Sequence, residues 1–212
     1  MYKKILFISG TRADYGKIKP LAKIVDKSKK FNVSFAVTGM HLSKIHGYTY
    51  YQIKQDFKNN KIFIFDNLSN SMDISLSKSI DGFNKIISNL NPDIIVAHGD
   101  RIEALAGSIV GHLNKILVCH IEGGEISGTV DDSMRHAISK MANIHFVSNE
   151  RAKIILKQLG KIDRNIYIIG PPEVDVMIGN KLPDLRIVKK KYMIEYNEYA
   201  IVCFHPDVNE KK

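Results

Sequence analysis

Short apolar runs alternate with amphipathic stretches along most of this chain, and no other feature of the sequence constrains the fold as strongly. Residues 75–90, for example, place Ile80, Phe83, Ile87 and Leu90 at helical spacing, on one face of an expected helix. Alternation of strands and helices predicts an α/β fold, with a doubly wound parallel sheet whose crossovers are right-handed.

The expected elements follow from the apolar runs and from the helical spacing between them. Strands are expected at 5–9, 33–37, 62–65, 94–97, 116–121, 144–148 and 166–169. Helices are expected at 17–29, 75–90, 102–114, 132–141 and 150–159. The residues expected on the buried face of the first helix are Ile18, Leu21, Ile24 and Val25. The third helix is rich in alanine and glycine, which would let it pack close to the sheet.

The last part of the chain follows a different pattern. Residues 179–192 are polar and rich in lysine, as in a connector, and the apolar run at 199–206 predicts a new strand. A strand followed by so few residues cannot build a second core. We therefore expect a truncated chain, with a first domain at 1–178 and, at 179–212, a connector plus the first strand of a second domain.

Charge and cysteine content exclude several classes of protein. Lysine and arginine number 31 against 22 acidic residues, but the lysines are scattered, whereas a nucleic-acid-binding protein concentrates its charge. The excess would instead help an anionic small molecule reach a cleft. Cys119 and Cys203 each lie in an apolar run, so we expect two core thiols, with neither a disulfide framework nor a zinc site.

The apolar segments are all short. Before its first polar turn, the N-terminal segment has only the run ILFI, which is too little for the core of a signal peptide. No apolar stretch approaches the length of a membrane span. We therefore expect a cytoplasmic protein that binds neither membrane nor nucleic acid.

Three polar clusters each follow an apolar run, at Gly10–Asp14, His98–Arg101 and His120–Glu125. If the runs are parallel strands, the clusters emerge along one edge of the sheet, where open α/β sheets bind ligands. Several carboxylates, two arginines and two histidines would then meet in one crevice. This convergence predicts an enzyme site.

The first cluster joins a strand to a helix. Its glycine permits a sharp turn, free amides at the helix start favour an anion, and Arg12 and Lys17 add donors suited to phosphate. The segment has neither the GxGxxG pattern of dinucleotide-binding proteins nor the GxxxxGK[ST] pattern of P-loops. Solvated charges on an ordinary strand–helix turn explain the motif equally well.

Glu122 is the strongest catalytic candidate in the other two clusters. It lies between Ile121 and two glycines, where burial should raise its pKa and suit it to general acid–base catalysis near neutral pH. A surface glutamate in a loop is the alternative.

Asp100 could act in the site or cap the helix that follows, and His98 could be a buried histidine that donates to the backbone.

Asp131 and Arg135 lie four residues apart at the start of an expected helix, where they can pair and where acids favour the helix dipole. This structural role is sufficient without a catalytic one. A two-metal hydrolase is also conceivable, with the ligands His98, Asp100, His120 and Glu122. Arg101 places a cation beside these ligands, which counts against a metal site.

Five segments of the sequence carry a resemblance to a known family. GTRADYGKIKPL, TGMHLS, HGDRIEALA, CHIEGGEISGTVDDSMRHAISK and a late FHP together resemble the hydrolysing UDP-N-acetylglucosamine 2-epimerases of bacterial sialic acid synthesis. They also resemble the relatives that act on diacetylbacillosamine nucleotides in legionaminic acid synthesis. The likeness covers essentially the whole chain, and residues 116–140 are its most specific part.

The resemblance implies a Rossmann-like domain that forms the N-terminal half of a GT-B fold, in which two such domains close over a nucleotide sugar. It implies a reaction in which the nucleoside diphosphate leaves the anomeric carbon as the C2 proton is removed. Water then adds to the glycal and gives a free 2-epimeric sugar of the N-acetylmannosamine type. The substrate is a UDP or GDP sugar, no metal or other cofactor is implied, and the full-length protein would be a homo-oligomer. This chain alone would be inactive.

By the same resemblance, Asp100, Glu122 and Asp131 are the acid–base residues, with their individual steps left open. The residues that match positions for the nucleotide sugar or its diphosphate are Arg12, Lys17, Arg135 and His205. A GT-B glycosyltransferase, which passes the sugar to an acceptor, shares the architecture, and a non-catalytic α/β binding module is a further alternative. The carboxylates of Asp100 and Glu122 favour elimination over transfer.

Overall fold

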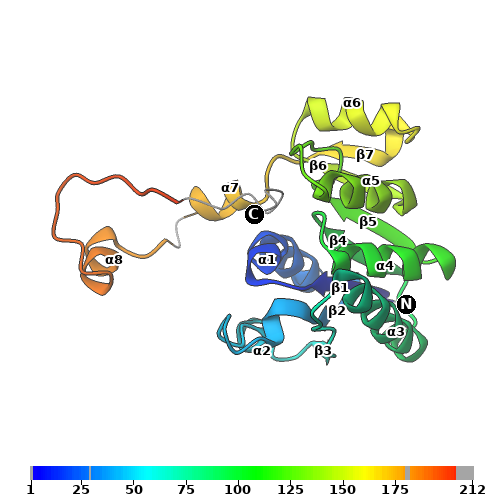
Figure 1. Ribbon diagram of the computed structural model, residues 1–212, viewed down its shortest axis with the longest axis horizontal. Helices are drawn as coiled ribbons and strands as arrows, with labels where there is room; N and C mark the ends of the chain where they lie inside the picture. The colour runs from blue at the N-terminus through cyan, green and yellow to red at the C-terminus, as the bar shows by residue number, and fades with distance from the viewer. Residues whose placement is uncertain (1, 29, 180–181, 204–212) are drawn as a thin grey trace. The chain divides into compact units, whose positions relative to one another are not determined.

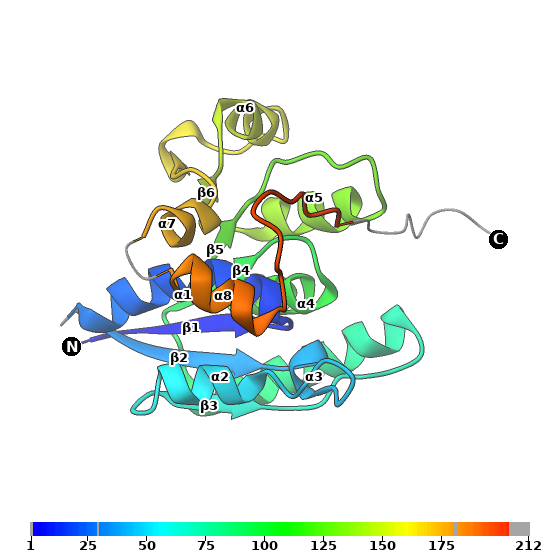
Figure 2. The ribbon, with the colours of Figure 1, turned by 90° about the vertical axis from the view of Figure 1, so that its left-hand side faces the viewer.

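The computed structural model describes residues 2–28, 30–179 and 182–203. Its larger unit, which ends at Val174, contains seven parallel strands in the order β3-β2-β1-β4-β5-β6-β7, which confirms the predicted doubly wound sheet. The strands are β1 (Lys3–Ser9), β2 (Phe31–Val37), β3 (Lys61–Ile64), β4 (Ile94–His98), β5 (Leu117–Ile121), β6 (Ile144–Val147) and β7 (Ile166–Ile168). Figure 2 shows β1, β2 and β3 side by side in one half of this sheet.

Helices cover both faces of the sheet (Figure 1). They are α1 (Arg12–Lys27), α2 (Tyr50–Asp56), α3 (Met72–Leu90), α4 (Ile102–Leu113), α5 (Asp131–Met141) and α6 (Glu150–Gln158), with short 3-10 helices at Gly39–Leu42 and Asp163–Asn165. α1 and α2 pack on one face around Phe7 and Phe35, whereas α3 and α4 pack on the other around Leu6 and Ile95. Successive residues of β1 therefore enter opposite cores, because the side chains of a strand alternate between its faces.

α1 begins at Arg12, earlier than the expected helix at 17–29, because Thr11 caps it. The Thr11 hydroxyl accepts from the backbone N–H of Asp14, and the Asp14 carboxylate accepts from the backbone N–H of Thr11. The residues that α1 buries are Asp14, Tyr15, Ile18 and Ala22. The prediction that Ile24 shares this face is wrong. Ile24 is 68% exposed, because it lies two residues, or about 200° of helical turn, beyond the buried Ala22.

α4 lies close against the sheet, as its small residues predict. A Cβ atom on Gly107 would be 2.0 Å from Ile8 Cδ1, and one on Gly111 would be 2.6 Å from Val118 Cγ2. Larger residues at these two positions would push the helix outward. The close packing therefore holds the β4–α4 loop, which carries part of the predicted site, near the edge of the sheet.

The smaller unit, which begins at Asp175, contains most of α7 (Glu173–Met177) and all of α8 (Leu185–Lys191). The expected connector therefore includes a helix. The Asp184 side chain caps α8 by accepting from the backbone N–H of Arg186. No helix within the described ranges combines the length and the apolar character that crossing a membrane requires.

The predicted strand at 199–206 is wrong for residues 199–203, which have no regular secondary structure, and 204–206 lie outside the described residues. A strand gains its backbone hydrogen bonds from a neighbouring strand, and the described part of the smaller unit contains none. For the same reason Cys203 is exposed, contrary to the expectation of a core thiol. Cys119 is buried as expected, and burial raises the pKa of its thiol to about 11.

Candidate active site

A cavity of about 320 Å³ lies at the carboxyl edge of the sheet, among the loops that follow β1, β4 and β5. It is lined by Thr11, Ala13, Asp14, Lys17, His98, Gly99, Asp100, Arg101, Glu122, Glu125 and Arg135. All three polar clusters seen in the sequence therefore contribute to one cavity. The predicted site residues that line it are Lys17, Asp100, Glu122 and Arg135.

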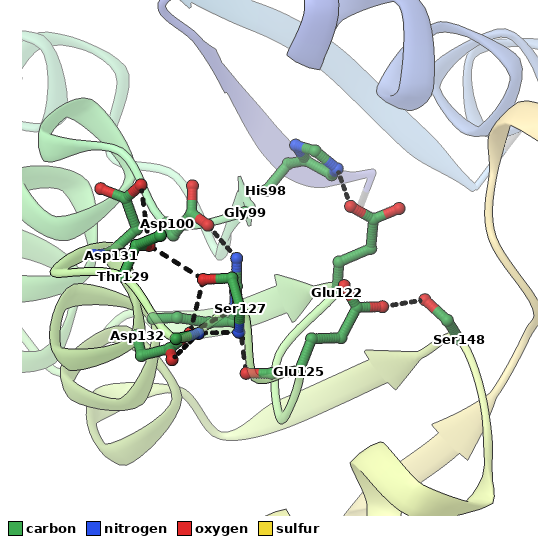
Figure 3. A network of polar contacts seen from close by, with 12 residues as sticks. His98, Gly99, Asp100, Glu122, Glu125, Ser127, Thr129, Asp131, Asp132 and Ser148 are labelled. Atoms are coloured by element: carbon green, nitrogen blue, oxygen red, sulfur yellow. Dashed lines mark hydrogen bonds and ion pairs between the residues drawn. The ribbon is translucent and has the colours of Figure 1, made fainter. Parts of the chain in front are cut away.

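The Glu122 carboxylate is held by two nitrogen-bearing side chains. Lys17 Nζ donates to its Oε1 and Oε2 at 2.9 and 2.8 Å. His98 Nε2 lies 2.9 Å from Oε2 (Figure 3). The prediction that burial raises the pKa of Glu122 is wrong. Burial acts in that direction, but contacts with His98 and Lys17 outweigh it and lower the pKa to about 2. Glu122 is therefore ionised at neutral pH.

Lys17 reaches the site from the second turn of α1. Its side chain is 31% exposed, and its Nζ also lies 3.6 Å from Glu173 Oε1. Burial lowers the pKa of Lys17, but the carboxylates of Glu122 and Glu173 more than compensate and raise it. Lys17 is therefore a cation that is shared between two carboxylates. Glu173 was not predicted, because nothing in the sequence indicates that it lies beside α1.

Arg135 connects α5 to the loop after β4. Its guanidinium forms an ion pair with Asp100 Oδ2, and a second nitrogen lies 3.1 Å from Asp132 Oδ1. The same nitrogen donates to the carbonyl oxygen of Glu125 at 3.0 Å. Asp100 is thus a carboxylate of the site with its own cation, rather than a simple helix cap, because the N-cap of α4 is Arg101.

Asp131 does not pair with Arg135, contrary to the i,i+4 prediction. The acidic partner of Arg135 on α5 is Asp132, three residues before it, whereas the Asp131 carboxylate accepts from Thr129 Oγ1 at 3.3 Å. Asp131 is half-buried and lies beside Thr129 in Figure 3, and it does not line the cavity. Of the three predicted acid–base residues, the structure brings Asp100 and Glu122 into the cavity and leaves Asp131 outside its lining.

The turn after β1 presents fewer free amides than expected. The backbone N–H groups of Gly10 and Thr11 donate to the Asp14 carboxylate at 2.9 and 2.8 Å, so the prediction of an anion held by free amides is wrong for these two. Arg12 is exposed and lines a neighbouring cavity of about 580 Å³. That cavity shares Thr11 and Ala13 with the first, so the two cavities are adjacent.

His120 is a structural residue that does not line the cavity. It is fully buried, with Nδ1 2.9 Å from Ser139 Oγ and Nε2 2.7 Å from the Gly99 carbonyl oxygen. These contacts tie β5 to α5 and to the loop after β4. Of the two histidines expected in the crevice, the structure therefore places only His98 there, and His98 contacts a carboxylate rather than the backbone.

Glu125 is a lining carboxylate that was not predicted as a site residue. Its Oε1 accepts from Ser148 Oγ at 2.7 Å (Figure 3). The sequence did hold a signal for it, because it ends the cluster that contains Glu122.

Among the described residues, no three His, Cys, Asp or Glu side chains are grouped so that they could share a metal ion. His205, a predicted ligand of the nucleotide sugar, lies outside the described residues.

Comparison with known proteins finds relatives named as 2-epimerases of sugar nucleotides. A family profile described as UDP-N-acetylglucosamine 2-epimerase matches residues 23–212. A protein of that name from Neisseria meningitidis serogroup B is 44% identical over 98% of this chain and 55% of its own length. The UDP-N,N'-diacetylbacillosamine 2-epimerase (hydrolyzing) of Legionella pneumophila is 36% identical over 99% of this chain and 57% of its own length. The chain thus spans about half the length of the curated relatives it matches.

Solved structures show the same fold. The crystal structure of UDP-GlcNAc 2-epimerase from Neisseria meningitidis bound to UDP-GlcNAc has a TM-score of 0.77 at 20% identity, over 89% of this chain and 52% of that one. A putative UDP-N-acetylglucosamine 2-epimerase from Listeria monocytogenes has a TM-score of 0.77 at 24% identity, with the same coverage. These enzymes are of the GT-B type, and this chain corresponds to one Rossmann-like half of them. Since the family profile matches most of its residues, the chain belongs to the UDP-N-acetylglucosamine 2-epimerase family.

Proposed function

We propose that this chain forms the catalytic N-terminal part of a hydrolysing 2-epimerase that acts on a nucleotide sugar of the UDP-N-acetylglucosamine type. One observation carries the proposal. The carboxylates of Asp100, Glu122 and Glu125 line the same cavity as the cations of Lys17 and Arg135. In the proposed reaction the sugar becomes cationic and needs a carboxylate nearby, while the diphosphate becomes more anionic and needs a cation nearby. This cavity offers both carboxylates and cations.

The chemistry explains why carboxylates are required. The C2 proton is not adjacent to a carbonyl group, so it becomes acidic only as the C1–O bond weakens. A base takes that proton, the C2–H electron pair forms the C1=C2 double bond, and the C1–O pair leaves with the nucleoside diphosphate. The transition state carries positive charge at C1 and growing negative charge on the diphosphate, which carboxylates and cations stabilise respectively. Water then adds as hydroxyl at C1 and a proton on the opposite side of C2, which releases the free 2-epimer.

The carboxylates have different surroundings and therefore different capacities. Glu122 is ionised at neutral pH, so it can accept a proton or stabilise positive charge at C1. Asp100 is the second predicted acid–base residue in the cavity lining, and its pairing with Arg135 fixes its orientation. Asp131 remains a candidate for a third acid–base residue on the strength of the resemblance.

The cations are candidates for the diphosphate. Lys17 is partly exposed in the cavity, and Arg12 is exposed in the adjacent one, so both can reach a ligand that extends across the two. Arg135 and His205 complete the set by resemblance. Residues 1–178 would then form the catalytic domain, and 179–212 would lead into the domain that binds the nucleotide.

The names of the relatives support a place in nonulosonic acid synthesis. Two relatives act, by name, on diacetylbacillosamine nucleotides, at 36% and 35% identity. Another, from Escherichia coli, is named polysialic acid biosynthesis protein P7 and is 30% identical over 210 residues. Both the N-acetylglucosamine and the diacetylbacillosamine nucleotides are therefore substrates to test.

The test uses a full-length form, in which this chain is followed by the second half that its relatives have. UDP-N-acetylglucosamine or UDP-diacetylbacillosamine is incubated with it in heavy water, without an acceptor. We expect free sugar with deuterium at C2, seen by NMR, and a loss of rate of about 100-fold or more in Asp100→Asn and Glu122→Gln. Transfer of the sugar to an added acceptor, with no free sugar formed in its absence, would overturn the proposal in favour of a glycosyltransferase.

A further inference from the structure

The contact between His98 and Glu122 is built by the register of the sheet. His98 is the last residue of β4, Glu122 follows the last residue of β5, and the two strands are parallel neighbours in which His98 pairs with Ile121. His98 Nε2 lies 2.9 Å from Glu122 Oε2, and the two side chains are only 8% and 10% exposed. The contact is therefore held by rigid elements and is largely shielded from water.

The backbone of Glu122 adopts an uncommon conformation at this contact. Its φ of +61° lies in the left-handed region, which disfavours residues with a Cβ atom. The N–H of Glu122 donates to the Phe146 carbonyl oxygen at 2.9 Å, which ties the loop to β6. Figure 3 shows the carboxylate turned back toward the His98 imidazole. Backbone strain of this kind persists where the surrounding structure fixes a functional side chain.

His98 and Lys17 differ as partners of this carboxylate. The Lys17 ammonium lies at the end of a flexible four-carbon stem, and its side chain is 31% exposed. The imidazole of His98 has two rotatable bonds, is attached to the end of a strand and is nearly buried. Lys17 can therefore supply charge, but His98 is the partner that can define an orientation.

We propose that His98 is a positioning residue for the reaction. Its Nε2–H donates to Glu122 Oε2 and holds the carboxylate ionised and in one orientation within the cavity. The proton is on Nε2 because an ionised carboxylate can only accept. This inference rests on the proposed function, in which Glu122 acts beside the sugar. The charged groups of neighbouring elements that share the cavity are Asp14 and Lys17 of α1, Asp100 and Arg101 after β4, Glu125 after β5 and Arg135 of α5.

Two variants of the full-length form test the role in catalysis. His98→Met fills a similar volume without a donor, and His98→Gln restores an N–H near the position of Nε2 but cannot take up a second proton. We expect His98→Met to lower kcat about 100-fold with little change in KM, and His98→Gln to recover kcat to within about tenfold of the parent. The same substitutions at His112, an exposed residue of α4, are the matched controls and should leave kcat unchanged. An unchanged kcat in His98→Met, or a change confined to KM, would overturn the proposal.

Rescue by glutamine separates positioning from a merely structural role. A ring that only filled space would be replaced as well by methionine as by glutamine, whereas a donor that orients Glu122 is restored by glutamine alone. If His98→Met does not fold, His98→Gln decides the matter, and a loss of kcat well beyond about tenfold in a folded His98→Gln would overturn the proposal.

A measurement without turnover keeps this inference distinct from the proposed function. In the present chain, the titration of the Glu122 side-chain carboxyl can be followed by ¹³C NMR. We expect its midpoint to rise in His98→Met relative to the parent and to rise less in His98→Gln. Equal midpoints in all three proteins would overturn the proposal. Failure of the parent to release free sugar would instead overturn the proposed function, whatever the NMR result.

Discussion

Acidification from pH 7 to pH 5 should destabilise this fold through two buried histidines behind the cavity. His120 and His145 are 0% and 1% exposed, and burial lowers their pKa to about 3 and about 4, from an ordinary value of 6.5. In the unfolded chain both titrate near 6.5. As the pH falls through 6.5, protons therefore bind the unfolded chain but not the folded one, and the free energy of unfolding decreases.

The magnitude follows from these values. Between pH 7 and pH 5, proton binding to each histidine in the unfolded chain lowers the free energy of unfolding by about 2 kcal/mol. For a group with a pKa of 6.5 that stays neutral in the folded chain, the integral over this range corresponds to roughly 1.4 pH units, at 1.36 kcal/mol per unit. The total of about 4 kcal/mol is a large part of the 5–15 kcal/mol that stabilises a typical domain. His41, whose pKa is also lowered by burial, acts in the same direction. Glu122 does not interfere, because its contribution is lost only below its ordinary pKa of 4.5.

His145→Leu isolates one of these contributions. Neither ring nitrogen of His145 has a hydrogen-bond partner among the described residues, so leucine removes a titrating group without breaking a bond. At pH 7 we expect the free energy of unfolding of His145→Leu to equal that of the parent or to exceed it by up to about 1 kcal/mol. The loss between pH 7 and pH 5 should shrink by about 2 kcal/mol, measured by urea unfolding followed by circular dichroism. His112→Leu, at an exposed histidine, is the control. Equal losses in His145→Leu and the parent would refute the reasoning.

Two further predictions concern backbone and charge in the loops of the site. Gly124 and Gly128 have nearly equal φ angles, +81° and +80°, but different surroundings. A Cβ atom on Gly124 would lie 2.3 Å from the Ala152 carbonyl oxygen, whereas a Cβ atom on Gly128 would have no heavy atom within 4 Å. Gly128→Ala should cost about 1 kcal/mol of unfolding free energy and Gly124→Ala at least about 3, and equal costs would contradict this packing. Asp100→Asn removes a carboxylate partner of the nearly buried Arg135, so urea unfolding should show a loss of about 1–3 kcal/mol, and no loss would mean that the ion pair contributes nothing.

The architecture and the place of the site could be predicted because both depend on local patterns and topology. Apolar runs and helical spacing are visible in any window of the sequence, and parallel strands must end at a common edge. The cluster residues Asp100 and Glu122, which closely follow β4 and β5, therefore had to emerge near one another. The start of α1 was also encoded locally, since Asp14 follows Thr11 by three residues, as in a capping box whose acid is aspartate rather than glutamate.

The electrostatics of the site could not be predicted, because they depend on which side chains meet. The flanking residues of Glu122 indicate burial, which alone raises a pKa, but they do not show that Lys17 and His98 face the carboxylate from two other elements. Likewise, helical spacing allows Arg135 to pair with an acid either three or four residues before it. The choice of Asp132 depends on the position of the loop before α5, where Asp132 also accepts from Ser127 at 2.8 Å.

The charge state of Glu122 restricts its part in the proposed reaction. A carboxyl group with a pKa of about 2 carries no proton at neutral pH, so Glu122 begins the reaction as an acceptor that can take the C2 proton or face the charge at C1. In the proposed reaction a proton returns to the opposite side of C2, which a base that removed the first proton does not face. As a base it is weak while Lys17 neutralises it. A diphosphate that attracts Lys17 would leave His98 as its partner and restore part of its basicity, at about 1.36 kcal/mol per pKa unit. Binding of the leaving group and the strength of the base would then rise together. The proton that returns to C2 must come from a different group. Asp14 also lines the cavity, but its carboxylate accepts from the backbone N–H groups of Gly10 and Thr11, which leaves Asp100 and Glu125 as the candidates among the lining carboxyl groups.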